Sequence, residues 1–220
     1  MRLDSEVEAP LVFSGIVIDQ INNPLLIVPA RFVYSTSSTP WWWDRFAELV
    51  IEATGFSPKP LLVGDMPLVS QYALGSLIAM RNLGKRLSLS EDEIWETLEL
   101  IDSTMFESYV WKGVRYMQRT GTPILYRNLE DPVPVKLGHF FIRKIMSFPI
   151  STPRFMDGSL THLAGLIPVY MADKVTDDLV DAENGLWKIL HGLTTPPGNF
   201  KWVWDLRWST LIELLNWGVA

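Results

Sequence analysis

The 220-residue chain contains no cysteine, which excludes disulfide frameworks, thiolate metal sites and cysteine nucleophiles. It also lacks an excess of positive charge, because 19 lysines and arginines stand against 25 aspartates and glutamates, giving a formal net charge of −6. General nucleic-acid binders depend on clustered basic side chains, so this balance argues against that class. The three histidines show none of the spacings by which a helix presents metal ligands. We therefore expect no resident metal or cofactor.

Long hydrophobic runs are also missing. The most apolar window, residues 60–80, is interrupted by Asp65, Ser70 and Gln71. A membrane-spanning helix needs about 18 apolar residues in succession, so we expect no membrane span. The amino-terminal residues are acidic and do not show the basic and then apolar pattern of a secretory signal. We expect a cytoplasmic or equivalent soluble location.

The chain is rich in apolar and aromatic residues. Hydrophobic residues make up 48% of it and charged residues 20%, a composition that supports a folded core rather than disorder. Ten tryptophans are present, several times the roughly 1% that ordinary composition would supply. The length suits a single globular domain, residues 1–220, which is our prediction.

Two apolar runs near the amino terminus predict a β-hairpin. Residues 11–19 and 25–35 are rich in Val, Ile and Phe, and the turn-forming residues 20–24 separate them. The rest of the chain is predominantly helical by its patterns. We therefore predict an α+β fold, a predominantly helical single domain with a hairpin at about 11–35 and a helical body at about 40–220.

Helical periodicity and end signals place the elements of this body. Ser90 followed by Glu93 is a capping-box pattern, and Gly84 indicates a helix stop. We expect helices over residues 40–54, 67–83, 137–146, 159–172, 176–191 and 206–217. Another helix is expected to begin at residue 91, and a further one to end at residue 120. Short strands are expected near 123–126 and 200–204.

One acidic pattern suggests an enzyme. Asp177-Asp178-Leu179-Val180-Asp181 resembles the aspartate-rich DDxxD motif of isoprenoid diphosphate synthases and class I terpene synthases. The resemblance implies an all-helical fold in which Asp177, Asp178 and Asp181 hold magnesium against a substrate diphosphate, a role that suits hard carboxylate ligands. On a helix, however, Asp177 and Asp181 lie opposite the apolar residue Leu179, which favours a solvated face.

A basic group suggests another alternative. Arg143 and Lys144, with Arg154 nearby, are interleaved with phenylalanines, and this combination can support stacking on single-stranded nucleic acid. A structural role for these residues is the competing interpretation.

Three consecutive tryptophans are the most informative feature. On a helix their side chains diverge by about 100° each, so they cannot all enter one core. Trp42 shares its face with apolar residues, whereas Trp41 shares its side with Arg45 and Glu48, and Trp43 lies on the flank. Exposed tryptophan is frequently a binding hot spot. Trp41 is therefore either exposed for a partner or covered by the chain's own loops.

A second aromatic cluster lies near the carboxyl end. Phe200, Trp202 and Trp204 alternate with other residues, as in a half-buried strand. In the helix expected after them, Trp208 and Trp217 belong to a large apolar surface that suits either a core or a contact between protomers.

These observations favour a non-catalytic protein that binds another protein or its own copies through aromatic surface. The candidate partner-binding residues are Trp41, Trp43, Arg45, Glu48, Trp208 and Trp217. The alternatives are a magnesium-dependent enzyme acting on a diphosphate through Asp177, Asp178 and Asp181, and a single-stranded nucleic-acid binder using Arg143, Lys144 and Arg154.

Overall fold

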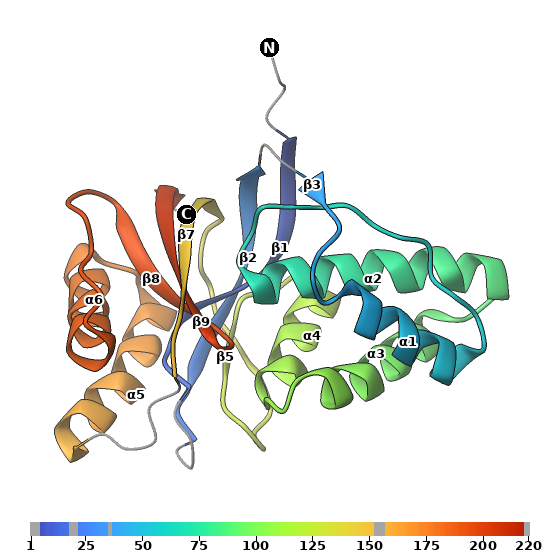
Figure 1. Ribbon diagram of the computed structural model, residues 1–220. Helices are drawn as coiled ribbons and strands as arrows, with labels where there is room; N and C mark the ends of the chain where they lie inside the picture. Colours follow the sequence, from blue (N-terminus) through green and yellow to red (C-terminus); the bar gives the residue numbers. More distant parts are fainter. Residues whose placement is uncertain (1–4, 18–21, 35–36, 152–156, 218–220) are drawn as a thin grey trace.

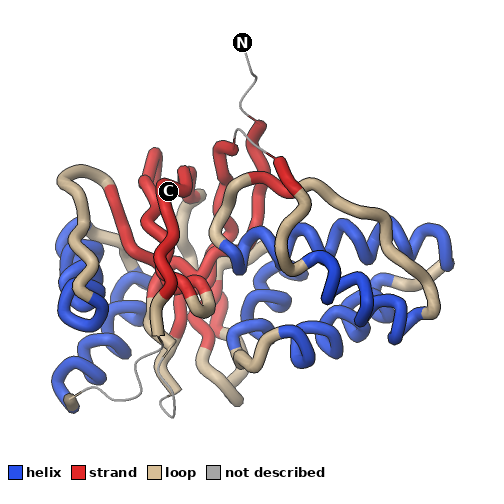
Figure 2. The backbone as a smooth tube through the Cα atoms, viewed as in Figure 1, coloured by secondary structure: helices blue, strands red, loops and turns tan. Residues whose placement is uncertain are grey.

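The computed structural model describes residues 5–17, 22–34, 37–151 and 157–217. A twisted β-sheet occupies the middle of the molecule (Figure 1). Helices α1–α4 gather on one side of it and α5 and α6 on the other, as the colouring by secondary structure in Figure 2 makes plain.

The main sheet has seven strands and mixes parallel and antiparallel pairs. The amino-terminal hairpin, β1 and β2, forms one side of it, and the other edge of β2 is shared by β5 and β7. Strand β7 runs parallel to β2, and the remaining pairs are antiparallel. The strands are β1 (Ser5–Ser14), β2 (Leu25–Tyr34), β5 (Ile124–Tyr126), β6 (Val133–Pro134), β7 (Phe140–Pro149), β8 (Phe200–Asp205) and β9 (Trp208–Trp217). A separate two-stranded sheet pairs β3 (Ser37–Ser38) with β4 (Val63–Gly64).

Six helices lie in the described part of the chain. They are α1 (Trp43–Thr54), α2 (Leu68–Leu87), α3 (Glu91–Met105), α4 (Val110–Thr120), α5 (Gly158–Asp173) and α6 (Asp177–His191). The capping box at the start of α3 is confirmed: Ser90 accepts from the Glu93 backbone amide, and the Glu93 carboxylate accepts from the Ser90 amide. Pro168 lies inside α5.

The expectation of a predominantly helical α+β domain is wrong. The fold is a mixed α/β structure built around the seven-stranded sheet. The predicted hairpin is present, although its first strand begins at Ser5 rather than at residue 11, and it is part of a larger sheet. The assignment of the whole chain to one domain remains a prediction.

Two predicted helices are strands. Residues 137–146 and 206–217 contribute to β7 and β9, which pair with each other along their length. Strand β9 lies between β7 and β8, and most of its described side chains are buried. The apolar residues of β9 also fall at helical spacing, and periodicity alone does not assign a short apolar segment to a strand or a helix.

Close packing also corrects one helix boundary. Helix α2 continues through Gly84 to Leu87, so Gly84 is not a helix stop. A Cβ at Gly84 would lie 2.7 Å from the Ile94 side chain, which shows that the glycine allows α3 to approach α2. The Gly84 position therefore serves helix packing rather than helix termination.

Among the described residues, no helix combines the length and the apolar character needed to cross a membrane.

A candidate aromatic binding groove

Trp41 and Trp208, far apart in the sequence, line the same cavity. This aromatic groove has a volume of about 530 Å³ and is lined by Trp41, residues 104–108, Trp204, residues 206–208, Val17 and Leu68. The exposed fraction is 71% for Trp41 and 37% for Trp208. Three segments with no local connection thus place aromatic side chains around one solvent-accessible hollow.

The wall that carries Trp208 is the turn between β8 and β9. Asp205 pairs with Trp208 across the strands, leaving Leu206 and Arg207 as the turn. Leu206 has φ of 64°, a left-handed conformation that leucine rarely adopts. Such conformations persist where the surrounding structure imposes them, and they cluster at binding sites.

A buried carboxylate connects this turn to α2. The Asp205 oxygens accept hydrogen bonds from the backbone amides of Leu68 and Val69 at 2.7 and 2.8 Å, and from the Thr210 hydroxyl at 2.8 Å. Asp205 therefore caps α2 from a distant strand, since the residue at the cap position, Pro67, has no side-chain acceptor. Burial raises the pKa of Asp205, and the amides of Val69 and Leu68 partly offset this rise.

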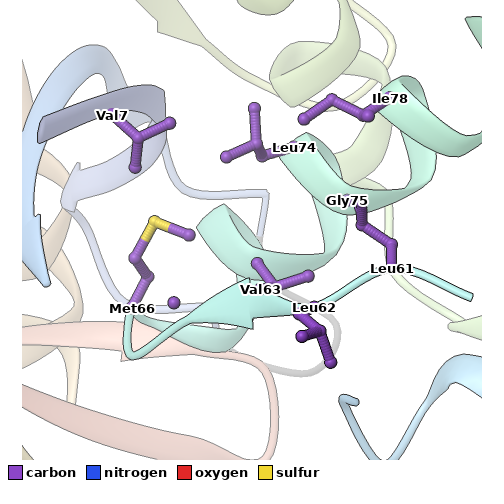
Figure 3. A pocket seen from close by; sticks show the side chains of 9 residues that line it. Val7, Leu61, Leu62, Val63, Met66, Leu74, Gly75 and Ile78 are labelled. Carbon is purple, nitrogen blue, oxygen red and sulfur yellow. The ribbon is translucent and has the colours of Figure 1, made fainter. Parts of the chain in front are cut away.

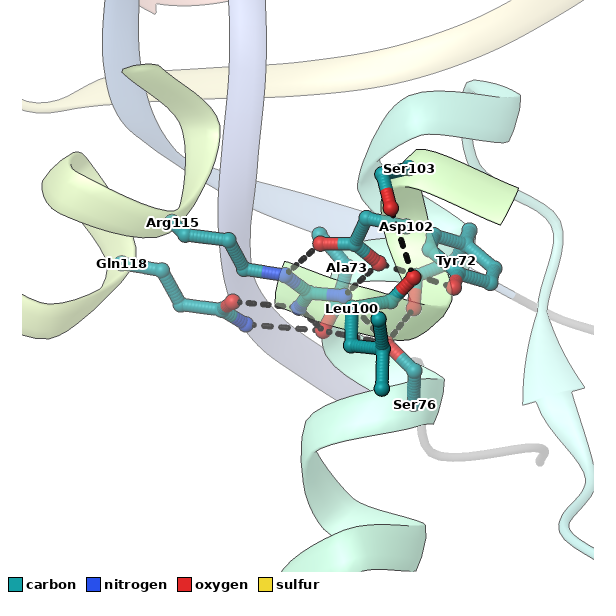
Figure 4. Close-up of polar contacts among 8 residues, drawn as sticks. All are labelled: Tyr72, Ala73, Ser76, Leu100, Asp102, Ser103, Arg115 and Gln118. Carbon is teal, nitrogen blue, oxygen red and sulfur yellow. Dashed lines mark hydrogen bonds and ion pairs between the residues drawn. The ribbon is translucent and has the colours of Figure 1, made fainter. Parts of the chain in front are cut away.

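A second part of the lining, residues 104–108, begins in the last turn of α3, and a buried ion pair supports it. The Arg115 guanidinium of α4 donates to both carboxylate oxygens of Asp102, at 2.7 and 2.8 Å (Figure 4). The side chains of both residues are almost fully buried. Arg115 also donates to the Ser76 hydroxyl and the Ala73 carbonyl of α2, so three helices share the network.

Aromatic stacking extends this support into the groove. The Phe106 ring lies 4.8 Å from the Tyr72 ring and 5.1 Å from the Trp111 ring, measured between centroids. The Tyr72 hydroxyl donates to Asp102 at 2.8 Å. Burial, with the nearby Asp102 carboxylate, raises the pKa of Tyr72 well above its ordinary value, so this hydroxyl remains a donor.

The segment bearing Trp41 is held by its neighbours. Trp42 is fully buried and packs edge-on against Tyr72, with centroids 5.0 Å apart, while its indole Nε1 donates to Gln71. Trp43 is also buried, with 5% of its surface exposed, and its ring packs at a tilt against the Phe46 ring. Of the three consecutive tryptophans, only Trp41 is exposed and therefore available to a partner.

The other predicted contact residues lie apart from this arrangement. Arg45 and Glu48 are exposed on α1 and form an ion pair with each other at 2.9 Å. They do not line the groove. Trp217 ends β9, where its backbone pairs with that of Phe140, but its side chain lies outside the described residues.

The three aspartates of the DDxxD-like pattern lie at the start of α6. Asp177, Asp178 and Asp181 are all outside the buried core, and Thr176 caps the helix by accepting from the Leu179 amide. In the described ranges no group of three or more acidic or histidine side chains is placed to hold a metal ion. Carboxylates near a helix amino terminus are favoured by its dipole, which accounts for their position.

The basic residues proposed for nucleic-acid contact are engaged in ion pairs. Arg143 pairs with Glu213 on the neighbouring strand, and Lys144 pairs with Asp65 at 2.6 Å. Arg154 lies outside the described residues. Arg143 and Lys144 are therefore both paired with carboxylates rather than free to contact a nucleic acid.

A second, smaller cavity contains no polar side chain. Its volume is about 90 Å³, and β1, α2 and the segment around β4 enclose it. Figure 3 shows that its lining is aliphatic apart from the Met66 sulfur. No hydrogen-bonding or charged side chain is directed into this cavity, so we interpret it as a gap in the apolar packing.

Sequence reasoning missed the groove wall at 104–108 and the roles of Asp102 and Asp205. The polar pair Asp102-Ser103 interrupts the apolar helical pattern and is the available signal for this part of the lining, since α3 ends soon after it, near Phe106. No local pattern indicated that Asp205 caps a helix more than a hundred residues earlier.

The sequence matches no protein-family model, and searches of curated proteins and of solved structures found no match. The groove itself is therefore the basis for a functional proposal.

Proposed function

We propose that this protein is a non-catalytic binding protein that captures another protein through the aromatic groove. The observation that carries the proposal is the convergence of two exposed tryptophans, Trp41 and Trp208, on one cavity. Tryptophan is enriched among the residues that dominate binding energy at protein interfaces. Exposure of two such rings on one cavity is explained by a partner that covers them.

The supports of the groove favour a preformed site. Asp205, the Asp102–Arg115 pair and the Tyr72 ring system hold its walls through buried contacts. Side chains held in this way lose little conformational freedom on binding. The entropic cost that opposes the interaction energy is therefore smaller.

The proposal is tested with a double variant, Trp41→Ala/Trp208→Ala, used as bait beside the wild-type protein in cross-linking capture from the native source. The matched control is Tyr170→Ala/Ile189→Ala, because these residues are exposed on α5 and α6, on the other side of the sheet. We expect partners captured by the wild type and the control to be lost with the groove variant. Near-ultraviolet circular dichroism checks that all three are folded.

Retention of every captured protein by the groove variant would show that the proposal is wrong. Light scattering at several concentrations adds a separate readout. If a wild-type dimer dissociates on substitution of Trp41 and Trp208, the partner is a second copy rather than another protein.

A further inference from the structure

Charge does not select the occupant of the aromatic groove. The described lining holds one acidic side chain, Glu107, and one basic side chain, Arg207, and both are exposed. The carboxyl end of α3 lies in this lining, whereas the amino ends of α1 and α4, which have no side-chain cap, adjoin its residues Trp41 and Ser108. These opposite helix ends and side chains offset one another. The groove therefore suits an occupant without net charge.

Unpaired hydrogen-bond donors characterise the lining more clearly than charge does. The indole N–H groups of Trp41 and Trp208 and the guanidinium of Arg207 have no hydrogen-bond partner among the described residues. These groups donate hydrogen bonds and cannot accept them. Glu107, which also has no partner in the described ranges, is the lining side chain that only accepts. An occupant that satisfies both tryptophans must therefore present hydrogen-bond acceptors beside an apolar surface.

A proline-rich backbone combines these two properties. Proline has a carbonyl oxygen but no N–H, and its ring is apolar. In the polyproline II helix the carbonyl oxygens make no internal hydrogen bonds, so they are free to accept. Aromatic-lined grooves bind such segments in several kinds of recognition domain, and the preformed helix loses little entropy on binding. Trp41 and Trp208, which are both exposed, offer the aromatic surfaces that this mode of binding uses.

Other backbone conformations fit the groove less well. Of its lining residues only Trp204 and Trp208 belong to strands, and each is at most one residue from the turn between β8 and β9. The lining therefore offers no length of strand edge with which an extended strand could pair. In an α-helix the carbonyl oxygens are bonded within the helix, so a helical partner would leave the indole N–H groups without backbone acceptors.

We propose that the occupant of the groove is an uncharged, proline-rich segment of the partner protein in the polyproline II conformation. Its proline rings pack against Trp41 and Trp208, and its carbonyl oxygens accept hydrogen bonds from the two indole N–H groups. This inference rests on the proposed function and specifies the chemistry of the partner. Glu107 and Arg207 are exposed, so they can remain hydrated when the groove is occupied.

The probe is the capped peptide acetyl-Ala-Pro-Pro-Pro-Pro-Ala-amide. It is compared with an analogue in which Ala replaces every Pro, and with the strand-forming peptide acetyl-Thr-Val-Thr-Val-Thr-Val-amide. Binding to ¹⁵N-labelled protein is followed through the indole N–H signals of Trp41 and Trp208, assigned by Trp→Phe variants. We expect both signals to shift with the proline peptide. The other two peptides should bind more weakly by roughly fivefold or more, because their flexible chains must be ordered on binding.

Charged analogues test the neutrality of the occupant. The last Ala of the proline peptide is replaced by Arg in one analogue and by Glu in another. At physiological ionic strength we expect both to bind within roughly threefold of the neutral peptide, since exposed charges interact weakly in water. A preference of about tenfold or more for either charged analogue would contradict the proposal of an uncharged occupant.

Variants of the protein test the indole donors. Trp41→Phe and Trp208→Phe keep an aromatic ring but remove the N–H group, and the signal of the remaining tryptophan reports binding. Each should weaken binding of the proline peptide by roughly two- to tenfold, the range of one neutral hydrogen bond. Tyr170→Phe is the matched control, because it removes a hydroxyl donor from an exposed ring on α5, on the other side of the sheet. It should leave the dissociation constant unchanged.

The inference is overturned if the alanine or the strand-forming peptide binds as tightly as the proline peptide, or if both Trp→Phe variants bind it as the wild type does. It is also overturned if the proline peptide shifts neither indole signal. If partner capture still depends on Trp41 and Trp208 in any of these cases, the proposed function stands and only the chemistry of the partner is wrong. If capture is independent of both tryptophans, the proposed function fails as well.

Discussion

Three adjacent tryptophans in this protein have three different environments. The exposed fraction is 71% for Trp41, zero for Trp42 and 5% for Trp43. The helix begins at Trp43, so Trp41 stands in the turn before it, where its direction is set by the buried rings that follow. The buried rings of Trp42 and Trp43 thus orient the exposed ring of Trp41. This explains how one large apolar side chain is held in solvent.

At the residue scale, Gly75 illustrates how closely Trp42 is packed. A Cβ at this position would lie 2.9 Å from the Trp42 ring. We expect Gly75→Ala to lower the free energy of unfolding by about 1–3 kcal/mol, as overpacked cores do. Gly185, inside α6 with no atom within 4 Å of its virtual Cβ, is the control. Gly185→Ala should raise the free energy of unfolding by about 0.5–1 kcal/mol, and urea denaturation measures both. Equal effects of the two substitutions would contradict this account.

His191 gives a prediction about pH. Its ring lies 5.2 Å from the Trp187 ring and its Nε2 is buried with no partner among the described residues. Burial lowers the pKa of His191 below 6.5. Because the folded state resists protonation, the stability contributed by neutral His191 is present above about pH 6.5 and is lost as the pH falls through the folded pKa.

The wild type should therefore lose more stability than His191→Phe between about pH 8 and about pH 5, where histidine titrates. Thermal unfolding at several pH values measures the difference. The exposed His162 provides the control substitution, His162→Phe, which should follow the wild-type profile. An identical pH profile for wild type and His191→Phe would show that the burial of this ring has no such effect.

At the element scale, α3 and α4 are joined by two ion pairs of different character. Asp102–Arg115 is buried, whereas Asp92–Arg119 is exposed, with a distance of 2.7 Å in each. Asp102→Asn leaves the Arg115 charge without its counter-ion inside the protein, and we expect a loss of about 3–5 kcal/mol. Asp92→Asn should change the free energy of unfolding by less than about 1 kcal/mol. Chemical denaturation distinguishes these outcomes, and similar losses at both sites would contradict the proposed role of burial.

Elements with local signals could be predicted from the sequence. The start of α3 follows from Ser90 and Glu93 alone, because both partners of the capping box lie within one turn. Strands β7 and β9 could not be predicted in the same way. Lys144 and Ile212 become neighbours only when the two strands pair, and their sequence separation conceals this contact. The predominantly helical prediction failed because pairing partners decided the structure of these segments.

In the candidate site, too, only the residues with a local sequence signal could be predicted. Trp41 could be recognised as an outlying ring from the polar residues around it. The local pattern predicts a helix at Trp208, so neither its position at a turn nor its convergence with Trp41 could be foreseen. Residues 104–108 form a wall only because Arg115 holds Asp102 and Phe106 stacks on the Trp111 ring. Such contacts depend on the packed fold rather than on any local spacing.

At the scale of the whole molecule, α6 connects two strands of the sheet, β1 and β8, whose backbones do not pair with each other. Glu183 accepts from the Ser14 hydroxyl and the Gly15 amide at the end of β1, and from the Lys201 ammonium of β8 at 2.5 Å. The neighbouring Asn184 donates to the Phe200 carbonyl and accepts from the Trp202 amide, so it pairs with the backbone of β8. Helix α6 thus covers an edge that would otherwise present free backbone groups.

The buried pair of Glu183 and Lys201 gives the last prediction. Both side chains are at most 2% exposed, and burial lowers the pKa of Lys201 while Glu183 opposes that change. Lys201→Met leaves the carboxylate buried without its cation, and we expect a loss of about 3–5 kcal/mol. The double variant Glu183→Gln/Lys201→Met removes both charges, yet the amide oxygen of the introduced glutamine can still accept from Ser14 and Gly15. It should be more stable than Lys201→Met alone, which a double-mutant cycle by urea denaturation would reveal as coupling. Strictly additive losses would show that the two charges stabilise the sheet independently, and that α6 does not connect β1 to β8 through this pair.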